Sequence, residues 1–167
     1  MVSRRSLLST GGSILIGGGI MGMLSRTGAA AAEGSFSVVK SDDEWRKILS
    51  PQAYEVLRKH GTERAGSSPL DHEKRQGIFA CAGCAQDLFS SRDKFDSGTG
   101  WPSFTRPIDN AVGTSEDRTY FMVRTEVHCS RCGGHLGHVF NDGPKPTGLR
   151  YCMNGVAMTF RAADQPA

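Results

Sequence analysis

The first 32 residues of the chain contain no aspartate or glutamate, and the first acidic residue is Glu33. This segment holds Arg4, Arg5 and Arg26, so it accounts for the whole formal net charge of +3. Removing three basic residues from 20 leaves 17 in residues 33–167, against 17 acidic residues. A neutral domain argues against the strong basic patch typical of nucleic-acid-binding proteins, so we expect no nucleic-acid partner.

The chain also lacks low-complexity segments and internal repeats, apart from one duplicated cysteine pair. Its composition, 38% hydrophobic and 22% charged, excludes the disordered, collagen-like and coiled-coil classes. A length of 167 residues suits one globular domain with an appendage.

The acid-free segment has the layout of an export signal. Arg4 and Arg5 precede an apolar stretch over about 7–24, and Ala29–Ala32 then offer small-residue cleavage sites. The paired arginines make it similar to a twin-arginine signal, which predicts a signal peptide over 1–32 and an exported, bacterial periplasmic protein. An uncleaved anchor is the alternative, but an anchor needs about 20 mostly apolar residues. This stretch is interrupted by glycines, which argues against an anchor. Once the signal is cleaved, we expect no stable membrane insertion of the remaining chain.

The remaining residues, 33–167, are expected to form a single domain that begins with two short helices. Ser41 and Glu44 have the spacing of a capping box, which predicts a helix start. Pro51 is suited to the first turn of a second helix, and Gly61 is expected to end it.

Beyond a polar loop over 62–75, enrichment in β-branched and aromatic residues predicts strands. The expected strands span 77–81, 87–90, 120–127, 136–140 and 150–160. We therefore expect a mainly β fold, a small antiparallel two-sheet β domain with short N-terminal helices in front.

Four of the five cysteines form two C-x-x-C pairs, Cys81 with Cys84 and Cys129 with Cys132. Two thiolates three residues apart can bind one cation, and four together form a closed tetrahedral zinc site. In an oxidising compartment the same residues could instead form disulfides, or one pair could act as a redox dithiol.

The fifth cysteine, Cys152, has no such partner. A single thiol in an exported protein is either buried packing or a reactive group. Arg150 and Asn154 lie two positions to either side, so on a strand all three side chains share one face. A nearby cation lowers a thiol pKa and favours the nucleophilic thiolate, so Arg150 is expected to activate Cys152.

Upstream of this cysteine lie His135 and His138, followed by Asp142. Two histidines at this spacing could form a second metal pair, or one imidazole could act as a general acid beside the thiol. The residues themselves leave both interpretations open.

Taken in order, these motifs resemble the type B methionine sulfoxide reductase family. The matching segments are C-x-x-C at 81–84, K-F-D-S-G-T-G-W-P-S-F at 94–104, a long segment C-x-x-C-G-G-H-L-G-H-V-F-N-D-G-P at 129–144 and R-Y-C-M-N at 150–154. The resemblance covers about 41–160. It implies thiol-dependent reduction of methionine sulfoxide, either protein-bound or free. The epimer reduced would be R, because one reductase type serves each epimer.

The resemblance also implies roles for individual residues. Cys152 would attack the sulfoxide sulfur and become a sulfenic acid, and His138 would donate the proton that the sulfoxide oxygen requires. Residues supporting the site would be His135, Asn154, Arg150 and Asp142. Trp101 and Phe104 would line the substrate pocket, although core packing is the alternative for Trp101. The two cysteine pairs, Cys81, Cys84, Cys129 and Cys132, would hold one structural zinc ion.

One departure from the family bears on how the enzyme is regenerated. Many members carry a second cysteine at the position of Thr99, and this chain has no sixth cysteine to replace it. We therefore expect an external thiol, thioredoxin-like or another reductant, to reduce the Cys152 sulfenic acid directly. An exported enzyme would need that donor on the far side of the membrane, where its substrates would be oxidised proteins.

Two other classes compete with the enzyme. One is a zinc-stabilised binding module without catalysis, in which Cys152 is only packing. The other is a secreted domain stabilised by disulfide bonds. Reactivity of Cys152 under native conditions separates the first from the enzyme, and metal content separates the second.

Overall fold

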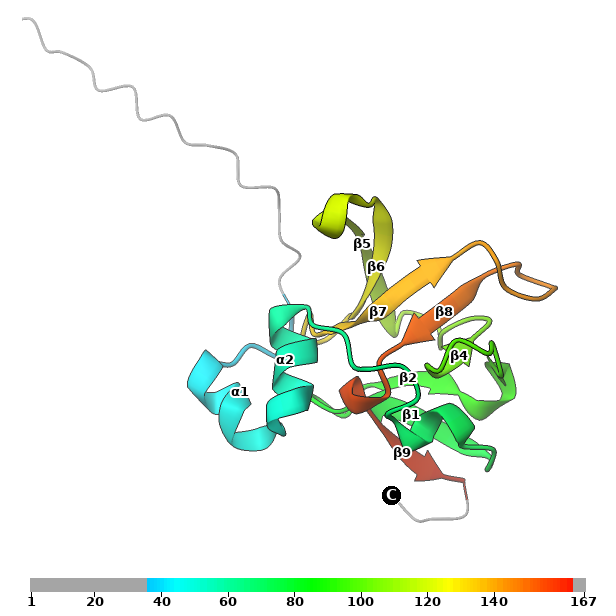
Figure 1. The fold of residues 1–167 in the computed structure, drawn as a ribbon. Helices are drawn as coiled ribbons and strands as arrows, with labels where there is room; N and C mark the ends of the chain where they lie inside the picture. The colour runs from blue at the N-terminus through cyan, green and yellow to red at the C-terminus, as the bar shows by residue number, and fades with distance from the viewer. Residues whose placement is uncertain (1–35, 164–167) are drawn as a thin grey trace, which may run out of the picture. The chain divides into compact units, whose positions relative to one another are not determined.

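The computed structural model describes residues 36–163, apart from the side chain of Tyr120. The predicted signal peptide, residues 1–32, lies outside this range. Within it, short helices precede two antiparallel sheets (Figure 1). No helix in the described part of the chain has the length and apolar character needed to cross a membrane.

Helix α1 (Asp42–Ile48) begins with the predicted capping box, because the Ser41 hydroxyl accepts from the Glu44 N–H and the Glu44 carboxylate accepts from the Ser41 N–H. Helix α2 (Pro51–Lys59) starts at the predicted proline. It ends one residue earlier than expected. His60, with φ 56° and ψ 31°, takes the left-handed cap conformation and ends the helix in place of Gly61.

The predicted two-sheet β fold is confirmed. One sheet has the strand order β2-β1-β9 and the other the order β3-β4-β8-β7-β6-β5, and every pairing within them is antiparallel. The strands are β1 (Gly77–Cys81), β2 (Asp87–Ser90), β3 (Lys94–Phe95), β4 (Ser103–Phe104), β5 (Val112–Asp117), β6 (Arg124–Cys129), β7 (His135–Phe140), β8 (Arg150–Met153) and β9 (Met158–Ala162). The 3₁₀ turn η1 (Pro69–His72) lies between α2 and β1. Three further 3₁₀ turns link strands: η2 (Ser91–Asp93), η3 (Thr119–Phe121) and η4 (Gly155–Ala157).

Two predicted strands differ from the structure. The segment 150–160 is divided by η4 into β8 and β9, which belong to different sheets. The segment 120–127 begins as η3 at the tip of the β5–β6 hairpin, and β6 starts only at Arg124. The hairpin projects beyond its neighbours in Figure 1, so the apolar residues of its tip are exposed instead of forming a strand.

An aromatic core lies beneath β4, and Phe104 is part of it. The Phe104 ring has no exposed surface, stacks on Phe89 at a centroid distance of 4.3 Å and meets Phe79 edge-on at 5.0 Å. Our expectation that Phe104 contacts substrate is therefore wrong, because a fully buried ring cannot line an open pocket.

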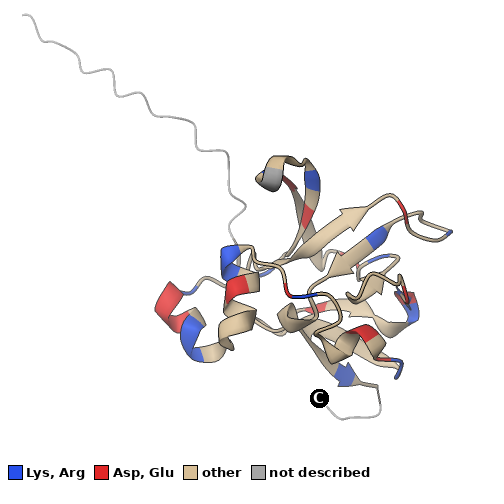
Figure 2. Ribbon diagram, viewed as in Figure 1, with Lys and Arg blue, Asp and Glu red and all other residues tan. Residues whose placement is uncertain are grey.

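The described surface carries no segregated charge. Helix α1, for example, carries acidic residues in its first turn and basic residues in its last turn, and Figure 2 shows both signs interspersed over the ribbon. This distribution agrees with the balanced charge of residues 33–167.

Candidate active site and metal centre

The two cysteine pairs come together from strands that belong to different sheets. Cys81 ends β1 and Cys129 ends β6, and each is followed by a turn that carries the second cysteine of its pair. The four Sγ atoms all lie within 4.8 Å of one another, and none of the five cysteines is in a disulfide. This cluster joins the two sheets, which β1 and β6 represent.

The distances within the cluster fit zinc. Cys81 Sγ lies 3.7 Å from Cys132 Sγ, and Cys84 Sγ lies 3.5 Å from Cys129 Sγ. In a tetrahedral site with Zn–S bonds of about 2.3 Å, neighbouring sulfurs are about 3.8 Å apart. Four thiolates with no other protein ligand form a closed structural site. The arrangement disfavours the disulfide alternative, because S–S bonds are only about 2.05 Å long.

Cys152 lies in the middle of the six-stranded sheet. It occupies β8, where its register partners are Ser103 on β4 and His138 on β7. The thiol is half-buried. The cysteine that stands alone in the sequence is thus flanked across the strands by a hydroxyl and an imidazole.

Hydroxyl groups gather on one side of this thiol. Thr99 Oγ1 lies 4.0 Å from Cys152 Sγ, and Ser97 Oγ links Thr99 and Ser103 at 2.8 and 2.7 Å. Thr99 is the position at which relatives were expected to carry a second cysteine. The structure places it against Cys152, so a hydroxyl stands where a resolving thiol would be in reach.

The balance of effects on the thiol differs from our expectation. Burial raises the pKa of Cys152 above its usual value, and this effect outweighs the hydrogen bonds of Thr99 and Ser103 and the charge of Arg150, all of which lower it. The expected role of Arg150 is correct in sign but smaller than the cost of burying a thiolate.

Arg150 is fixed by Asp142. Its guanidinium donates Nε–H and Nη2–H to the two carboxylate oxygens at 2.8 and 2.7 Å and stacks over the Phe140 ring at 4.5 Å. Only 12% of the arginine side chain is exposed, against 60% of Asp142. The pair therefore holds a cation beside β8 in one orientation.

His138 pairs with an aspartate that the sequence analysis did not identify. His138 Nε2 lies 2.7 Å from Asp117 Oδ2, which also accepts from Arg124 Nη2 at 2.6 Å. Hydrogen bonds from Thr119 and these two groups lower the pKa of Asp117, so it is ionised. Burial lowers the pKa of His138, and the hydrogen bond to Asp117 partly opposes that effect. Since Nε2 is engaged, Nδ1 is the nitrogen left for substrate.

His135 is brought beside His138 by a β-bulge. Residues three apart point to opposite faces of a regular strand. The β6–β7 register shifts here, with Val127 opposite Gly137 and His128 opposite His135, so Leu136 is skipped. The two imidazole centroids are 5.3 Å apart as a result.

A second carboxylate orients His135. Its Nδ1 lies 2.7 Å from Glu126 Oε1, while its Nε2 is buried and has no hydrogen-bond partner within residues 36–163. An unpaired buried nitrogen costs about 1–3 kcal/mol, so a ligand that pairs with it gains that energy. Burial alone raises the pKa of Glu126, but hydrogen bonds from His135, His60 and Ser115 outweigh it and lower the pKa.

Trp101 and Asn154 are both anchored to Glu63. Trp101 Nε1 donates to the Glu63 carbonyl at 3.2 Å, and Asn154 Oδ1 accepts from the Glu63 N–H at 2.9 Å. Asn154 also donates Nδ2–H to the Leu136 carbonyl at 3.0 Å. Asn154 follows the end of β8 and is 3% exposed, so it fixes the backbone around the site instead of sharing the strand face of Cys152.

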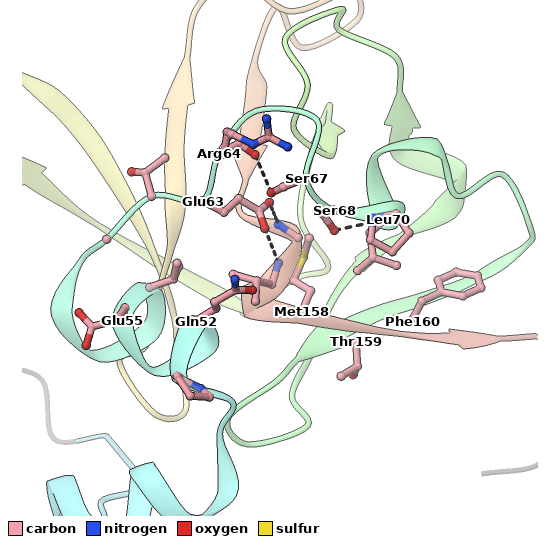
Figure 3. A pocket seen from close by; sticks show the side chains of 17 residues that line it. Gln52, Glu55, Glu63, Arg64, Ser67, Ser68, Leu70, Met158, Thr159 and Phe160 are labelled. Carbon is pink, nitrogen blue, oxygen red and sulfur yellow. Dashed lines mark hydrogen bonds between the residues drawn. The ribbon is translucent and has the colours of Figure 1, made fainter.

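A cavity of about 1030 Å³ lies between α2, η4 and β9 (Figure 3). Glu63 lines it, and its carboxylate accepts from the Gly155 and Val156 N–H groups. Burial raises the pKa of Glu63 in spite of these two bonds. Cys152 and the active-site histidines do not line this cavity, which is thus separate from the site around the thiol.

Comparison with known proteins agrees with this site. The SelR domain family model matches residues 49–162. A relative from Methanosarcina barkeri, "Peptide methionine sulfoxide reductase MsrB", is 55% identical over 130 residues, covering 77% of this chain and 92% of its own length. The chain belongs to the type B methionine sulfoxide reductase family. Proteins of the same name from Leptospira interrogans (50% over 128 residues, 76% and 98% covered) and Agrobacterium fabrum (53% over 124 residues, 74% and 92% covered) are further relatives.

Sequence reasoning thus missed the residues that orient the family's site in this chain. Asp117 and Glu126 have no motif of their own, since each is one acid among 17. Glu126 lies two residues ahead of His128 and three ahead of Cys129 on β6. Its proximity to that cysteine was the only feature of the sequence that could have marked it as a candidate site residue.

Proposed function

We propose that this protein is a peptide-methionine (R)-S-oxide reductase, which reduces the R epimer of methionine sulfoxide in oxidised proteins to methionine. The observation that carries the proposal is the position of Cys152. A single thiol faces His138 across one strand pair and Ser103 across the other, with the Thr99 hydroxyl at 4.0 Å. This is a nucleophile with a proton donor beside it.

In the first step, the Cys152 thiolate attacks the sulfoxide sulfur. The sulfoxide oxygen is transferred to Cys152, so the substrate sulfur gains two electrons and leaves as a thioether, while the cysteine is oxidised to a sulfenic acid. Cys152 is the residue that changes oxidation state. Burial favours the neutral thiol over the thiolate, and Arg150 offsets part of that cost.

The oxygen must be protonated as its bond to sulfur breaks. His138 Nδ1 is free of the Asp117 contact, and His135 Nε2 is a buried nitrogen without a hydrogen-bond partner among residues 36–163. The two carboxylates, Asp117 and Glu126, each hold one imidazole by its other nitrogen. We assign His138 as the leading proton donor, which passes to the oxygen a proton that its Nδ1 takes up from the Cys152 thiol, and His135 as the group that orients the oxygen.

Regeneration uses an external thiol. The sulfenic acid reacts with one thiol to form a mixed disulfide and water, and a second thiol then releases Cys152 and a disulfide. Thr99 cannot supply that thiol, and the other four cysteines are clustered together as the proposed zinc ligands. The partner is a thioredoxin-like protein or another thiol reductant. An internal disulfide to Cys152 in the oxidised, zinc-loaded protein would contradict this cycle.

The four-cysteine cluster would hold one zinc ion per chain, through Cys81, Cys84, Cys129 and Cys132. Zinc there supplies folding free energy and no chemistry, because a closed site leaves no open coordination position. The ion would connect the end of β1 to the end of β6 and so hold the two sheets together.

We further propose that residues 1–32 direct export by the twin-arginine route and that residues 33–167 form the mature reductase in the bacterial periplasm. The support is the order of paired arginines, apolar stretch and alanines in an acid-free segment. Replacement of both Arg4 and Arg5 by lysine should retain the protein in the cytoplasm on fractionation. Equal periplasmic amounts of the variant and the wild type would refute the twin-arginine route.

The reaction is tested with the separated R and S epimers of a blocked methionine sulfoxide and dithiothreitol as reductant. The purified zinc-loaded chain should turn over the R epimer only, and Cys152→Ser should abolish turnover without changing the folded circular dichroism spectrum. No turnover by the folded wild type would instead favour a zinc-stabilised binding module, the competing assignment.

A further inference from the structure

A second group of potential metal ligands includes His135, one of the two active-site histidines, and none of the four cysteines. His60, Glu126 and His135 place one ligand atom each within 4.8 Å of one another. His60 Nδ1 lies 2.9 Å and His135 Nδ1 lies 2.7 Å from the same oxygen, Glu126 Oε1. We propose that these three residues form a binding site for a divalent transition-metal ion such as Zn²⁺, distinct from the four-cysteine site.

The fold builds this convergence from two distant segments. Glu126 and His135 lie on the paired strands β6 and β7. His60 arrives from the end of α2, where its left-handed conformation turns the chain, while Arg58 donates Nη1–H to the Cys132 carbonyl at 3.0 Å and anchors the helix end. The His60 and His135 rings are 5.3 Å apart.

The donor set matches the chemistry of borderline metals. Two imidazoles and one carboxylate form the protein ligands of several zinc sites that keep a fourth position open for water. Ligand atoms in a tetrahedral zinc site with bonds of about 2.1 Å lie about 3.4 Å apart. The two contacts to Glu126 Oε1 would each have to lengthen by well under 1 Å.

Two of the three proposed ligands are buried and held in place, and the third is exposed to solvent. Only 2% of the His135 side chain and 11% of Glu126 are exposed, against 63% of His60. Glu126 Oε2 accepts from the Ser115 hydroxyl at 2.6 Å, which fixes the carboxylate with Oε1 toward the histidines. An ion would enter from the side of His60, and His60 would complete its coordination by a rotation at the surface.

An ion at this site would share His135 with the active site. The Nδ1 atom of His135 would bind the metal instead of donating a hydrogen bond to Glu126. The ring would then be locked in the tautomer with a proton on Nε2. His135 could then no longer change its tautomer or the orientation of its ring when the sulfoxide oxygen binds. This consequence rests on the proposed function: occupancy of the site should lower reductase turnover.

Zn²⁺ binding by the full chain tests the site. The protein carries Cys152→Ser, which removes the free thiol as a competing ligand, and its four-cysteine site is loaded with zinc beforehand. Calorimetry should then find about one further equivalent of bound Zn²⁺, and imidazole NMR resonances of His60 and His135 should shift. His60→Asn should weaken this binding by about 100-fold or more, because it removes a direct ligand.

The variants are matched to the backbone. Asparagine tolerates the left-handed conformation of residue 60, so His60→Asn keeps the cap of α2. His72→Asn, at the end of η1 and outside the cluster, is the control and should bind like the parent protein. Absence of a further equivalent, or equal binding by the His60→Asn variant, would overturn the site whatever the protein's activity.

Activity is measured separately, with Cys152 intact. Added Zn²⁺ should inhibit the wild type at concentrations that fill the site and leave the His60→Asn variant at least about 10-fold less sensitive, since that variant lacks a ligand. Equal inhibition of both proteins would refute the link to catalysis. A protein that binds the second ion but reduces neither sulfoxide epimer would refute the proposed function and leave the metal site standing.

Discussion

Gly137 is the position at which a single methyl group should most disturb the active site. It lies on β7 opposite Met153 of β8, with φ +155°, a conformation that L side chains rarely adopt. A Cβ at this position would lie 2.1 Å from the Cys152 carbonyl oxygen and 3.0 Å from Met153 Cα. Both atoms belong to the backbone, so neither can rotate away, and β7 and β8 would have to separate beside the nucleophile.

The cost of Gly137→Ala follows from two effects. Forcing a side chain into such a conformation costs about 1–3 kcal/mol. Overpacking a closely packed site costs a further 1–3 kcal/mol or so. We expect the free energy of unfolding to fall by about 2–6 kcal/mol, a large part of the roughly 5–15 kcal/mol of a typical domain. A displacement of Cys152 by about 1 Å should lower kcat/KM for the R epimer about 100-fold.

Urea denaturation of the zinc-loaded protein measures the first effect, and reductase kinetics measure the second. Gly148→Ala is the matched control, because Gly148 also has a positive φ, +70°, but a Cβ there would have no neighbour within 4 Å. The control should lose only about 1–2 kcal/mol and keep its activity. If Gly137→Ala were no more destabilising than Gly148→Ala, the close approach of β7 to β8 would not limit this site, and the reasoning would fail.

Three further predictions concern charge and metal. Removal of zinc from the cysteine cluster by a chelator should lower Tm by more than about 10 °C in calorimetry, because a structural metal contributes folding free energy; an unchanged Tm would contradict a structural role. Arg150→Met should raise the pKa of Cys152 further and slow its alkylation by iodoacetamide at pH 8 about 3–10-fold; a rate equal to that of the wild type would show that Arg150 does not act on the thiol. Since the pKa of Glu126 is lowered on folding, its contribution to stability is present above its unfolded value of 4.5 and should be lost as pH falls below that value. Acid titration followed by circular dichroism should therefore show a flatter acid limb in Glu126→Gln, and identical limbs would exclude Glu126 as a stabilising carboxylate.

Local signals in the sequence were sufficient for most of the regular structure. The Ser41 capping box, Pro51 at a helix start and the strands at 77–81 and 87–90 all occur as predicted, because each depends on residues within one turn or one strand. The errors occur where neighbours far away in the chain decide. The 150–160 segment has a continuous strand pattern, but η4 divides it because its two halves pair with β7 and β1 in different sheets.

The candidate site divides in the same way. The motifs indicate which residues have the right chemistry: the paired cysteines, Cys152 and the two histidines. They could not reveal that Asp117 and Glu126 hold the two imidazoles, since these contacts span 21 and 9 residues and depend on the register of β5, β6 and β7. The burial of Phe104 was equally hidden, because a motif does not show which face of a strand meets the core.

Sequence alone therefore determined the chemical composition of this protein's site, two pairs of cysteines and one further thiol with histidines nearby, and the class of its fold. These properties follow from residue types and short spacings. Only the tertiary structure decided the electrostatics: the burial that raises the pKa of Cys152, the carboxylate paired with each imidazole and the convergence of His60 on Glu126. Such properties depend on distance and exclusion of water, which arise only when distant segments pack together.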